Sequence, residues 1–263
     1  MEEKGNNKVL GREDLKKHFR NGQVPTEYDF GFLIDSMINK QDDGFRKEND
    51  SGFIISSIGS SKKLVTFLKN VNDLDPFFSI EKDEQGTASM RFNPGVDLKK
   101  ETDGTDDQSF FFGVDGNLGI GKRSDETLKI DIDGYAGSKG RVGTFASGDV
   151  PADGKWHTIL EGLDNCSAFE VVARTGKRGS GKFAILHAFA LSAFGNSRSR
   201  IRKTSAHYGF FWNRLNLRFR GTTHNYSLQL RTNTNYGSNI DIFYKITSLW
   251  DDERFMPKDY YNS

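Results

Sequence analysis

The sequence is short of cysteine and of long apolar runs, and each shortage excludes a class of protein. Cys166 is the only cysteine among 263 residues, which excludes an intrachain disulfide scaffold and a metal cluster held by several thiolates. We expect its side chain to be a small buried apolar group. No run approaches the roughly 18 apolar residues of a membrane-spanning helix, and the first residues lack the apolar core of a secretory signal. We therefore expect synthesis in the cytoplasm without a signal peptide, and no membrane insertion.

Net charge and apolar content are also low. Lys and Arg number 37 against 36 Asp and Glu, a net charge of +1, so no overall field attracts nucleic acid and we expect no such partner. The apolar fraction is 35%, below the roughly 45–50% of globular proteins. The aromatic share of 13%, with 22 Phe, favours short strands over a helical bundle. So little apolar material also predicts that the chain oligomerises.

A helical pattern is confined to residues 12–40. Thr26 is a candidate N-cap, with Asp29 three residues later. Apolar side chains come next at helical spacing, namely Phe30, Leu33, Ile34, Met37 and Ile38. We expect this apolar stripe to bind a partner protein. The alternative is that it packs within its own chain, as part of a small helical hairpin.

Alternating apolar and polar residues dominate 141–250, as in strands with one buried face. The clearest segments are 169–173, 182–191, 215–219, 226–230 and 240–246. In two of them the alternation predicts that the outward positions are Asn216, Arg218, Ser227 and Gln229. The chain is therefore expected to be mainly β with a small α-helical N-terminal segment, ending in a jelly-roll-like antiparallel β-sandwich.

Changes in pattern divide the sequence into three expected parts. We expect a helical attachment segment over 1–50, an irregular β-rich shaft or connector over 51–140, and a β-sandwich head over 141–263. Within the middle part, residues 62–70 fit either a strand or a turn of helix.

The motif nearest to a nucleotide-binding signature is Gly176-Lys-Arg-Gly-Ser-Gly-Lys182, which matches the start of a phosphate-binding P-loop. Phe183 stands where that loop needs a hydroxyl for magnesium, and the surrounding alternation favours a hairpin over the required helix. We predict a hairpin turn without nucleotide affinity. The five histidines show no ligand spacing, and we expect His187 in the core or at an interface. No enzyme activity, metal or cofactor is expected.

Aromatic and cationic residues interleave over 207–219, HYGFFWNRLNLRF. Such surfaces stack on sugars or bases. The candidate ligand-binding residues are Tyr208, Trp212, Arg214 and Arg218. The alternative is a core or subunit contact, because alternation would turn half of these rings inward.

Several short stretches resemble one known family. Among them are Leu15-Lys-Lys-His-Phe19, Gly22-Gln-Val-Pro-Thr-Glu27, Pro151-Ala-Asp-Gly-Lys-Trp-His-Thr-Ile159, Tyr208-Gly-Phe-Phe-Trp-Asn213 and Ile246-Thr-Ser-Leu-Trp250. They are similar to stretches in the tail-fibre-like and adhesin-like proteins of the contractile injection systems, derived from phage tails, of Bacteroidetes-type bacteria.

The resemblance implies a non-catalytic structural or adhesive component of such a particle, acting outside the cell or at its envelope. It further implies a homotrimer located near the baseplate or spike. With the apolar stripe, this leads us to expect attachment to spike or baseplate proteins through the N-terminal helices, and the residues 207–219 make a cell-surface glycan the candidate ligand. Two alternatives stay open, a free-standing glycan-binding module and a hydrolase of surface polysaccharide.

Overall fold

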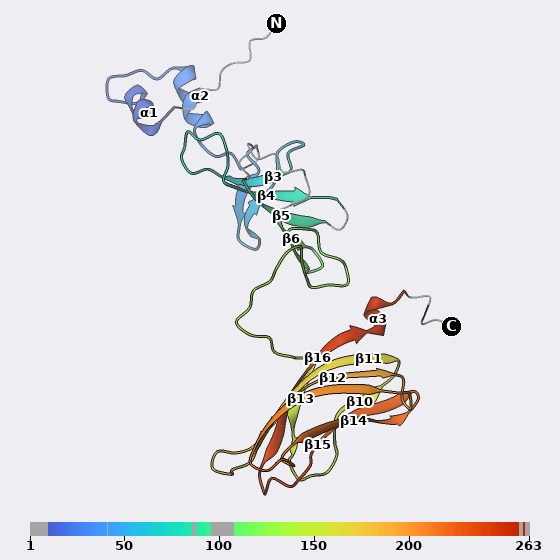
Figure 1. Ribbon diagram of the computed structural model, residues 1–263. Coiled ribbons are helices and arrows are strands. Elements are labelled where there is room, and N and C mark those ends of the chain that lie inside the picture. Colours follow the sequence, from blue (N-terminus) through green and yellow to red (C-terminus); the bar gives the residue numbers. More distant parts are fainter. Residues whose placement is uncertain (1–9, 41, 86–87, 96–107, 258–259, 261–263) are drawn as a thin grey trace. The chain divides into compact units, whose positions relative to one another are not determined.

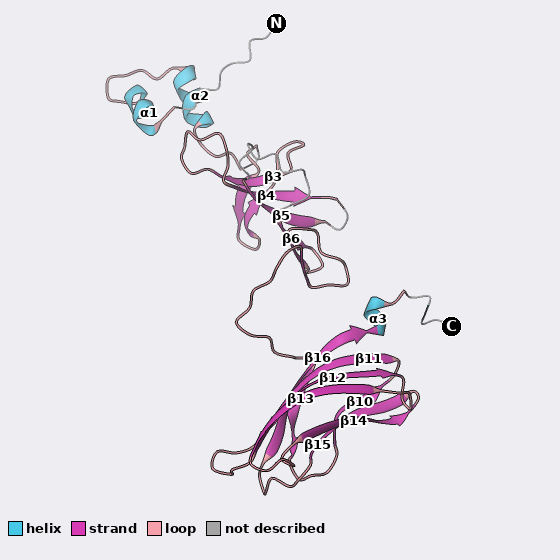
Figure 2. Cartoon of the chain, in the orientation of Figure 1, coloured by secondary structure: helices cyan, strands magenta, loops and turns pink. Residues whose placement is uncertain are grey.

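The computed structural model describes residues 10–40, 42–85, 88–95, 108–257 and 260 (Figure 1). The chain divides into two compact units, Met1–Ala136 and Gly137–Ser263. Strands predominate over helices in the described residues, as the alternating sequence predicts (Figure 2). No helix in this part of the chain is long and apolar enough to span a membrane.

The first unit begins with two short helices, α1 (Arg12–His18) and α2 (Glu27–Asp35). Thr26 is the N-cap of α2. Its backbone N–H and its hydroxyl donate hydrogen bonds to the Asp29 carboxylate, at 2.7 and 2.8 Å. The rings of Phe19 and Phe30 meet edge to face with centroids 5.6 Å apart. The predicted cap is confirmed, and the two helices contact each other as a small hairpin.

The rest of the first unit is β structure. A hairpin of β1 (Phe45–Glu48) and β2 (Gly52–Ile55) precedes a six-stranded sheet in chain order: β3 (Lys63–Phe67), β4 (Phe78–Asp83), β5 (Ser89–Pro94), β6 (Phe110–Gly113), β7 (Leu118–Ile120) and β8 (Ile130–Ile132). Neighbours are antiparallel except β7 and β8. The ambiguous segment 62–70 thus contains a strand, Lys63–Phe67, and no turn of helix. Residue 50, the expected end of the helical part, lies instead in the turn of the β1–β2 hairpin.

Phenylalanine side chains stabilise this sheet across its strands. Phe67, Phe78, Phe92 and Phe112 form a ladder with successive ring centroids 6.0, 6.1 and 4.9 Å apart. Phe111 points to the opposite face, as alternation requires, and is 2% exposed. Cross-strand aromatic pairs of this kind each contribute about 0.2–1 kcal/mol. A single sheet built in this way needs little aliphatic material.

The second unit is an antiparallel β-sandwich. Its strands are β9 (Ala146–Pro151), β10 (His157–Leu163), β11 (Cys166–Thr175), β12 (Phe183–Ala193), β13 (Arg200–Tyr208), β14 (Leu215–Thr222), β15 (Asn225–Thr232) and β16 (Asp241–Asp251), followed by α3 (Asp252–Phe255). One sheet has the order β13-β12-β11-β16-β9 and the other β10-β15-β14. The number of strands is that of a jelly roll, but they are divided five and three.

Alternation of buried and exposed residues gives the sandwich its core. Val171, Leu186 and Ile246 come from the larger sheet and Leu215 and Leu228 from the smaller one, all fully buried. Each such side chain contributes about 1.5–3 kcal/mol on burial. The second unit therefore has a complete core of its own, although the sequence as a whole is poor in apolar residues.

Two residues for which the sequence predicts a buried position are exposed, and for His187 the alternative of an interface stays a prediction. Cys166 is exposed, because it begins β11 at the end of the sheet. The side chain of His187 is 46% exposed, and its Nε2 lies 2.8 Å from Oε1 of Glu170. Residues alternate on β12, and the side chains of Leu186 and Ala188 take the inward positions. His187 is consequently on the outer face of the five-stranded sheet and not in the core.

Candidate ligand-binding surface

Four loops meet at one end of the sandwich. They are 152–156, 176–182, 209–214 and 233–240, and the strand ends that they join are paired in register: Pro151 with Asp241, Thr175 with Ala184, Phe183 with Tyr208, and Leu215 with Thr232. Sequence segments far apart in the chain are thereby brought together at this end.

The loop between β13 and β14 exposes four aromatic side chains, which we call the aromatic tip. Tyr208, Phe210, Phe211 and Trp212 are 66%, 64%, 68% and 42% exposed. Trp212 stacks on Phe210 with ring centroids 4.9 Å apart, and meets Phe211 edge to face at 4.6 Å. The rings support one another while facing water.

The backbone beneath the aromatic tip is held from inside. Asn213 is fully buried. Its Nδ2 donates a hydrogen bond to the Tyr208 carbonyl at 3.2 Å, and its Oδ1 accepts one from the Thr234 hydroxyl at 3.4 Å. Gly209 has φ +90°, and a Cβ there would lie 2.8 Å from both Asn213 Nδ2 and the Gly181 carbonyl oxygen. The tip is thus a fixed loop with exposed rings.

A second feature lies on the outer side of the three-stranded sheet and extends to the neighbouring edge strand β13. We call it the cationic face, and it consists of Lys203, Arg214, Arg218, Arg220 and Arg231. The guanidinium carbons of Arg218 and Arg231 lie over the Trp156 ring, 4.3 and 4.5 Å from its centre. One indole therefore holds two cations in place.

The positive charge of this face is not neutralised by the described residues. None of its five cations forms an ion pair with a described carboxylate. Burial, followed by the charges of Arg214 and Arg231, lowers the pKa of Lys203. Partial burial, followed by Arg220 and Arg231, likewise lowers the pKa of Arg218. Both shifts reflect partly desolvated cations that also repel one another.

Neutral polar side chains separate the cations. Oε1 of Gln229 accepts a hydrogen bond from Nε of Arg218 at 2.8 Å, and its Nε2 donates one to the Thr158 hydroxyl at 3.3 Å. Asn216 accepts a hydrogen bond from Lys203 and donates one to Asn233. The Nε of Arg231 is buried and has no hydrogen-bond partner among the described residues.

All four predicted ligand-binding residues lie on this part of the sandwich. Tyr208 and Trp212 belong to the aromatic tip, while Arg214 and Arg218 belong to the cationic face. Tyr208, Trp212 and Arg214 are exposed and Arg218 is half-buried, so the alternative of a core contact is wrong.

Sequence reasoning missed Trp156, Lys203, Arg220 and Arg231. The alternation of β14 and β15 placed Arg218 and Gln229 outward, and the same pattern extends to Arg220 and Arg231. Trp156 carried no such signal, because it precedes β10 and approaches the two arginines only through strand pairing.

The predicted partner-binding stripe is only partly helical. Phe30 and Ile34 are on α2 and are 51% and 61% exposed, and Leu33 on the same helix is half-buried. Met37 and Ile38 are exposed but lie beyond the helix, so their placement on it is wrong.

The reason is local to the end of α2. The Ser36 hydroxyl donates to the Phe32 carbonyl at 2.6 Å, and its backbone N–H donates to the same oxygen at 3.1 Å. Serine side chains compete in this way with the continuing helical ladder. The exposed apolar surface therefore combines one helix face with the turn after it.

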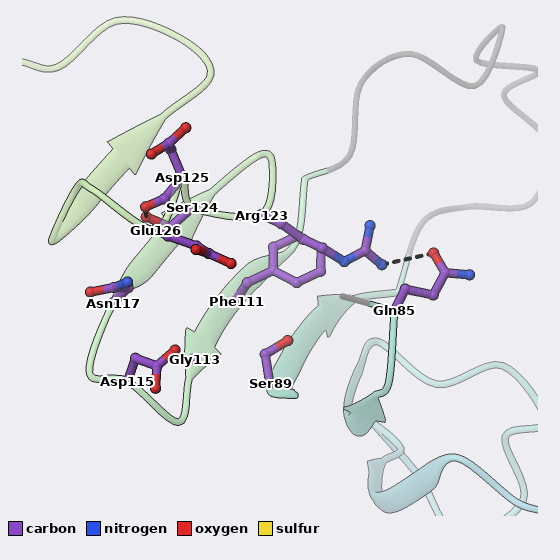
Figure 3. A pocket seen from close by; sticks show the side chains of 10 residues that line it. All are labelled: Gln85, Ser89, Phe111, Gly113, Asp115, Asn117, Arg123, Ser124, Asp125 and Glu126. Atoms are coloured by element: carbon purple, nitrogen blue, oxygen red, sulfur yellow. Dashed lines mark hydrogen bonds between the residues drawn. The ribbon is translucent and has the colours of Figure 1, made fainter. Parts of the chain in front are cut away.

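The first unit contains a separate pocket of about 280 Å³ around Phe111. Figure 3 shows the Arg123 guanidinium beside this ring, donating to Gln85 Oε1 at 3.1 Å. Arg123 also binds both carboxylate oxygens of Asp83, at 2.6 and 3.0 Å, and these hydrogen bonds lower the pKa of Asp83. No group of three metal-ligating side chains occurs in the described residues. We interpret this pocket as the surroundings of a structural ion pair.

The segment resembling a P-loop is a hairpin turn, as predicted. It joins β11 to the antiparallel β12, with Thr175 paired to Ala184. A strand therefore begins after Lys182, where a nucleotide-binding loop would have a helix. The absence of nucleotide affinity stays a prediction.

Comparison with known proteins adds no relative. No family model, no curated protein and no solved structure matches this chain.

Proposed function

We propose that this chain is a non-catalytic structural and adhesive component of a phage-tail-like contractile injection particle. The N-terminal helices attach it near the baseplate or spike, and the C-terminal sandwich is an oligomeric head, most simply a homotrimer. The assignment to a particle rests on the sequence resemblance. The assignment of an adhesive head rests on the surfaces of the sandwich.

The observation that carries the adhesive role is the aromatic tip. Four exposed rings on a loop fixed by the buried Asn213 are costly to leave in water, and rigid aromatic side chains are the residues that most often carry binding energy. Because the backbone is already ordered, a ligand loses little affinity to loop ordering.

The exposed side chains of α2 support the attachment role. Phe30 and Ile34 present an apolar surface that the helical hairpin does not bury. Because both side chains are already partly buried, complete burial against a partner would contribute about 1–1.5 kcal/mol for each before ordering costs.

Attachment is tested by the double substitution Phe30→Asp and Ile34→Asp in the full chain. We expect it to abolish incorporation into particles, or co-purification with spike and baseplate proteins, while the head stays folded. All three tryptophans, Trp156, Trp212 and Trp250, are in the second unit, so their fluorescence reports on the head alone.

The matched control is Val24→Asp, a residue that is 88% exposed and outside both helices. It should incorporate as the parent does. Normal incorporation of the double variant would place attachment elsewhere.

A free-standing glycan-binding module is the second candidate, and the aromatic tip and cationic face favour it equally. The two functions differ in what the N-terminal helices do. A free-standing module binds its glycan and remains at the cell surface without particle proteins, whereas an attached head depends on them. Release of reducing sugars from a bound polysaccharide would instead identify a hydrolase.

A further inference from the structure

The arginines over Trp156 are arranged to bind oxyanions. An aromatic ring stabilises a guanidinium through its face, and the N–H groups at the guanidinium edge stay available for hydrogen bonds in its plane. With guanidinium carbons 4.3 and 4.5 Å from the ring centre, Arg218 and Arg231 are both held in this way. Ordered before a ligand arrives, they lose little side-chain freedom on binding a carboxylate or sulfate.

The spacing of the cations is set by the strands that carry them. Adjacent strands lie about 4.8 Å apart and alternate residues of one strand about 6.7 Å apart. Arg218 and Arg220 are alternate residues of β14, and Arg231 is on the neighbouring β15, paired with Asn216. Lys203 reaches Asn216 from β13. The cations thus repeat over a short distance on one surface, which suits an anion that also repeats.

Polar groups between the cations indicate what kind of polymer carries the anions. Gln229, Thr158 and Asn216 offer both donors and acceptors, which match hydroxyl groups that are themselves donors and acceptors. A phosphodiester backbone offers acceptors alone. The exposed rings of the aromatic tip come just before Arg214 in the chain, with only the buried Asn213 between Trp212 and Arg214. The faces of these rings suit the apolar face of a sugar.

We infer that the cationic face binds an acidic polysaccharide, whose carboxylate or sulfate groups are held by Arg218, Arg231 and Lys203 and whose hydroxyl groups meet the intervening amide and hydroxyl side chains. This inference rests on the proposed adhesive function and names the ligand class of that head. Trp156 acts as a positioning residue, since it orders two arginines.

Nucleic acid is the less suitable anion. The ring of Trp156 is covered by guanidinium groups, so it is not free to stack on a base. The net charge of +1 also supplies no wider field for a long phosphate backbone.

The test measures binding of the full chain to polygalacturonate and chondroitin sulfate, with neutral dextran for comparison, by isothermal titration and affinity electrophoresis. We expect binding to the acidic polymers alone, weakening as salt rises. Replacing both Arg218 and Arg231 with Gln should weaken it by about tenfold or more.

The matched control replaces Arg200 and Arg202 with Gln. This double substitution also removes two positive charges, but from β13. Arg200 is paired with Leu191 and Arg202 with Phe189, so both arginines lie on the outer face of the five-stranded sheet, away from the cationic face. It should change affinity by less than about twofold. Trp156→Leu keeps every charge but removes the platform, so affinity should fall while the salt dependence persists.

The inference would be overturned by equal binding to dextran, by an unchanged affinity in the Arg218 and Arg231 variant, or by tighter binding of a mixed-sequence oligonucleotide with the same residue dependence. Absence of binding to both acidic polymers would also overturn it. If incorporation still depends on Phe30 and Ile34 in that case, the particle role survives and the ligand class alone falls. If incorporation does not depend on Phe30 and Ile34 but the chain still binds the acidic polymers, the ligand class survives and the particle role falls.

Discussion

Asp83 illustrates how a single buried charge stabilises the thin first unit. Its side chain is 7% exposed, while that of its partner Arg123 is 44% exposed. A carboxylate in that position would lose much of its hydration, and the two hydrogen bonds from Arg123 compensate for this loss. The guanidinium also lies over Phe111, with its carbon 5.1 Å from the ring centre, so the pair joins β4 to the loop after β7.

Replacement of Asp83 by Asn should destabilise the first unit by about 1–2 kcal/mol, a value reduced for the solvent around Arg123. Hydrogen exchange of β4–β6 at neutral pH measures this as faster exchange. Asp115→Asn, at an exposed position of the same pocket, is the control and should exchange as the parent does. Equal protection in both variants would contradict the structural role of the ion pair.

The same pair gives the first unit a dependence on pH. The pKa of Asp83 is lowered in the folded state, so its contribution is fully present above the unfolded carboxyl pKa of about 3.9 and is lost as pH falls through the lower folded value. The Asn variant should lack this part of the acid sensitivity.

At the scale of elements, the turn from Gly176 to Lys182 shows that a loop motif depends on the element after it. The residues match a phosphate loop, but β12 begins at Phe183 and the Lys182 ammonium lies 3.4 Å from the Asn235 carbonyl oxygen. In the described part of the sandwich, no helix directly follows this turn, so the turn lacks the helix N-terminus that a phosphate-binding loop requires. The lysine instead contacts the neighbouring loop.

We therefore expect Lys182→Ala to change the free energy of unfolding by no more than about 0.5 kcal/mol. Millimolar ATP should raise the melting temperature of neither the parent nor the variant. Differential scanning fluorimetry of the parent and the variant, with and without ATP, makes the comparison. Stabilisation of the parent by ATP that the variant lacks would show nucleotide binding.

Strands could be predicted from the sequence where one face of the strand is buried and the other is exposed. Alternation over 215–219 and 226–230 placed Leu217 and Leu228 inward and Arg218 and Gln229 outward, because a strand has no other way to bury its apolar residues. The end of α2 was not predictable from spacing. Apolar residues continue at Met37 and Ile38, but the Ser36 hydroxyl binds the Phe32 carbonyl and the helix stops.

The candidate site was less accessible to sequence reasoning than the fold. The aromatic tip is contiguous in the chain, so its residues could be recognised together. The cationic face joins Trp156 to Arg218 and Arg231 through pairing of β10, β15 and β14, and no local pattern records that contact. Long-range strand pairing also decided the position of His187, for which the apolar neighbours in sequence suggested the core or an interface, and placed it on the outer face of the five-stranded sheet.

For the whole molecule, the sequence leaves open how a chain with so few apolar residues forms a hydrophobic core. The second unit concentrates these residues in one core, so the expectation that oligomerisation must complete a core does not apply to this unit. Yet the outer face of its five-stranded sheet carries apolar side chains that are 42–55% exposed, which we call the apolar sheet face. They are Val172, Ile185, Phe189, Leu191 and Phe243.

This surface is the feature that best fits contact between copies of the chain. Strand register places the five residues on one outer face of β12, β11 and β16, where His187, Arg174 and Lys245 stand between them. Exposed apolar side chains gathered on one face of a sheet are typical of a subunit interface. Because these side chains are already about half-buried, each would contribute about 1 kcal/mol on complete burial before the cost of association. The apolar sheet face therefore replaces the missing core as the argument for an oligomer.

We predict that the full chain is an oligomer at micromolar concentration, and three is the expected number of subunits. The double substitution Ile185→Asp and Phe189→Asp should convert it to monomers that keep the tryptophan fluorescence of a folded head. Charges on this face would have to be buried on assembly, whereas they are hydrated in the monomer. Light scattering coupled to size-exclusion chromatography measures the mass. Phe210→Asp with Phe211→Asp, which alters two similarly exposed rings of the aromatic tip, is the control and should retain the parent's mass. If the unsubstituted chain has the mass of one subunit, it is not an oligomer. If the Ile185 and Phe189 variant stays oligomeric while the Phe210 and Phe211 variant is monomeric, the interface lies at the aromatic tip.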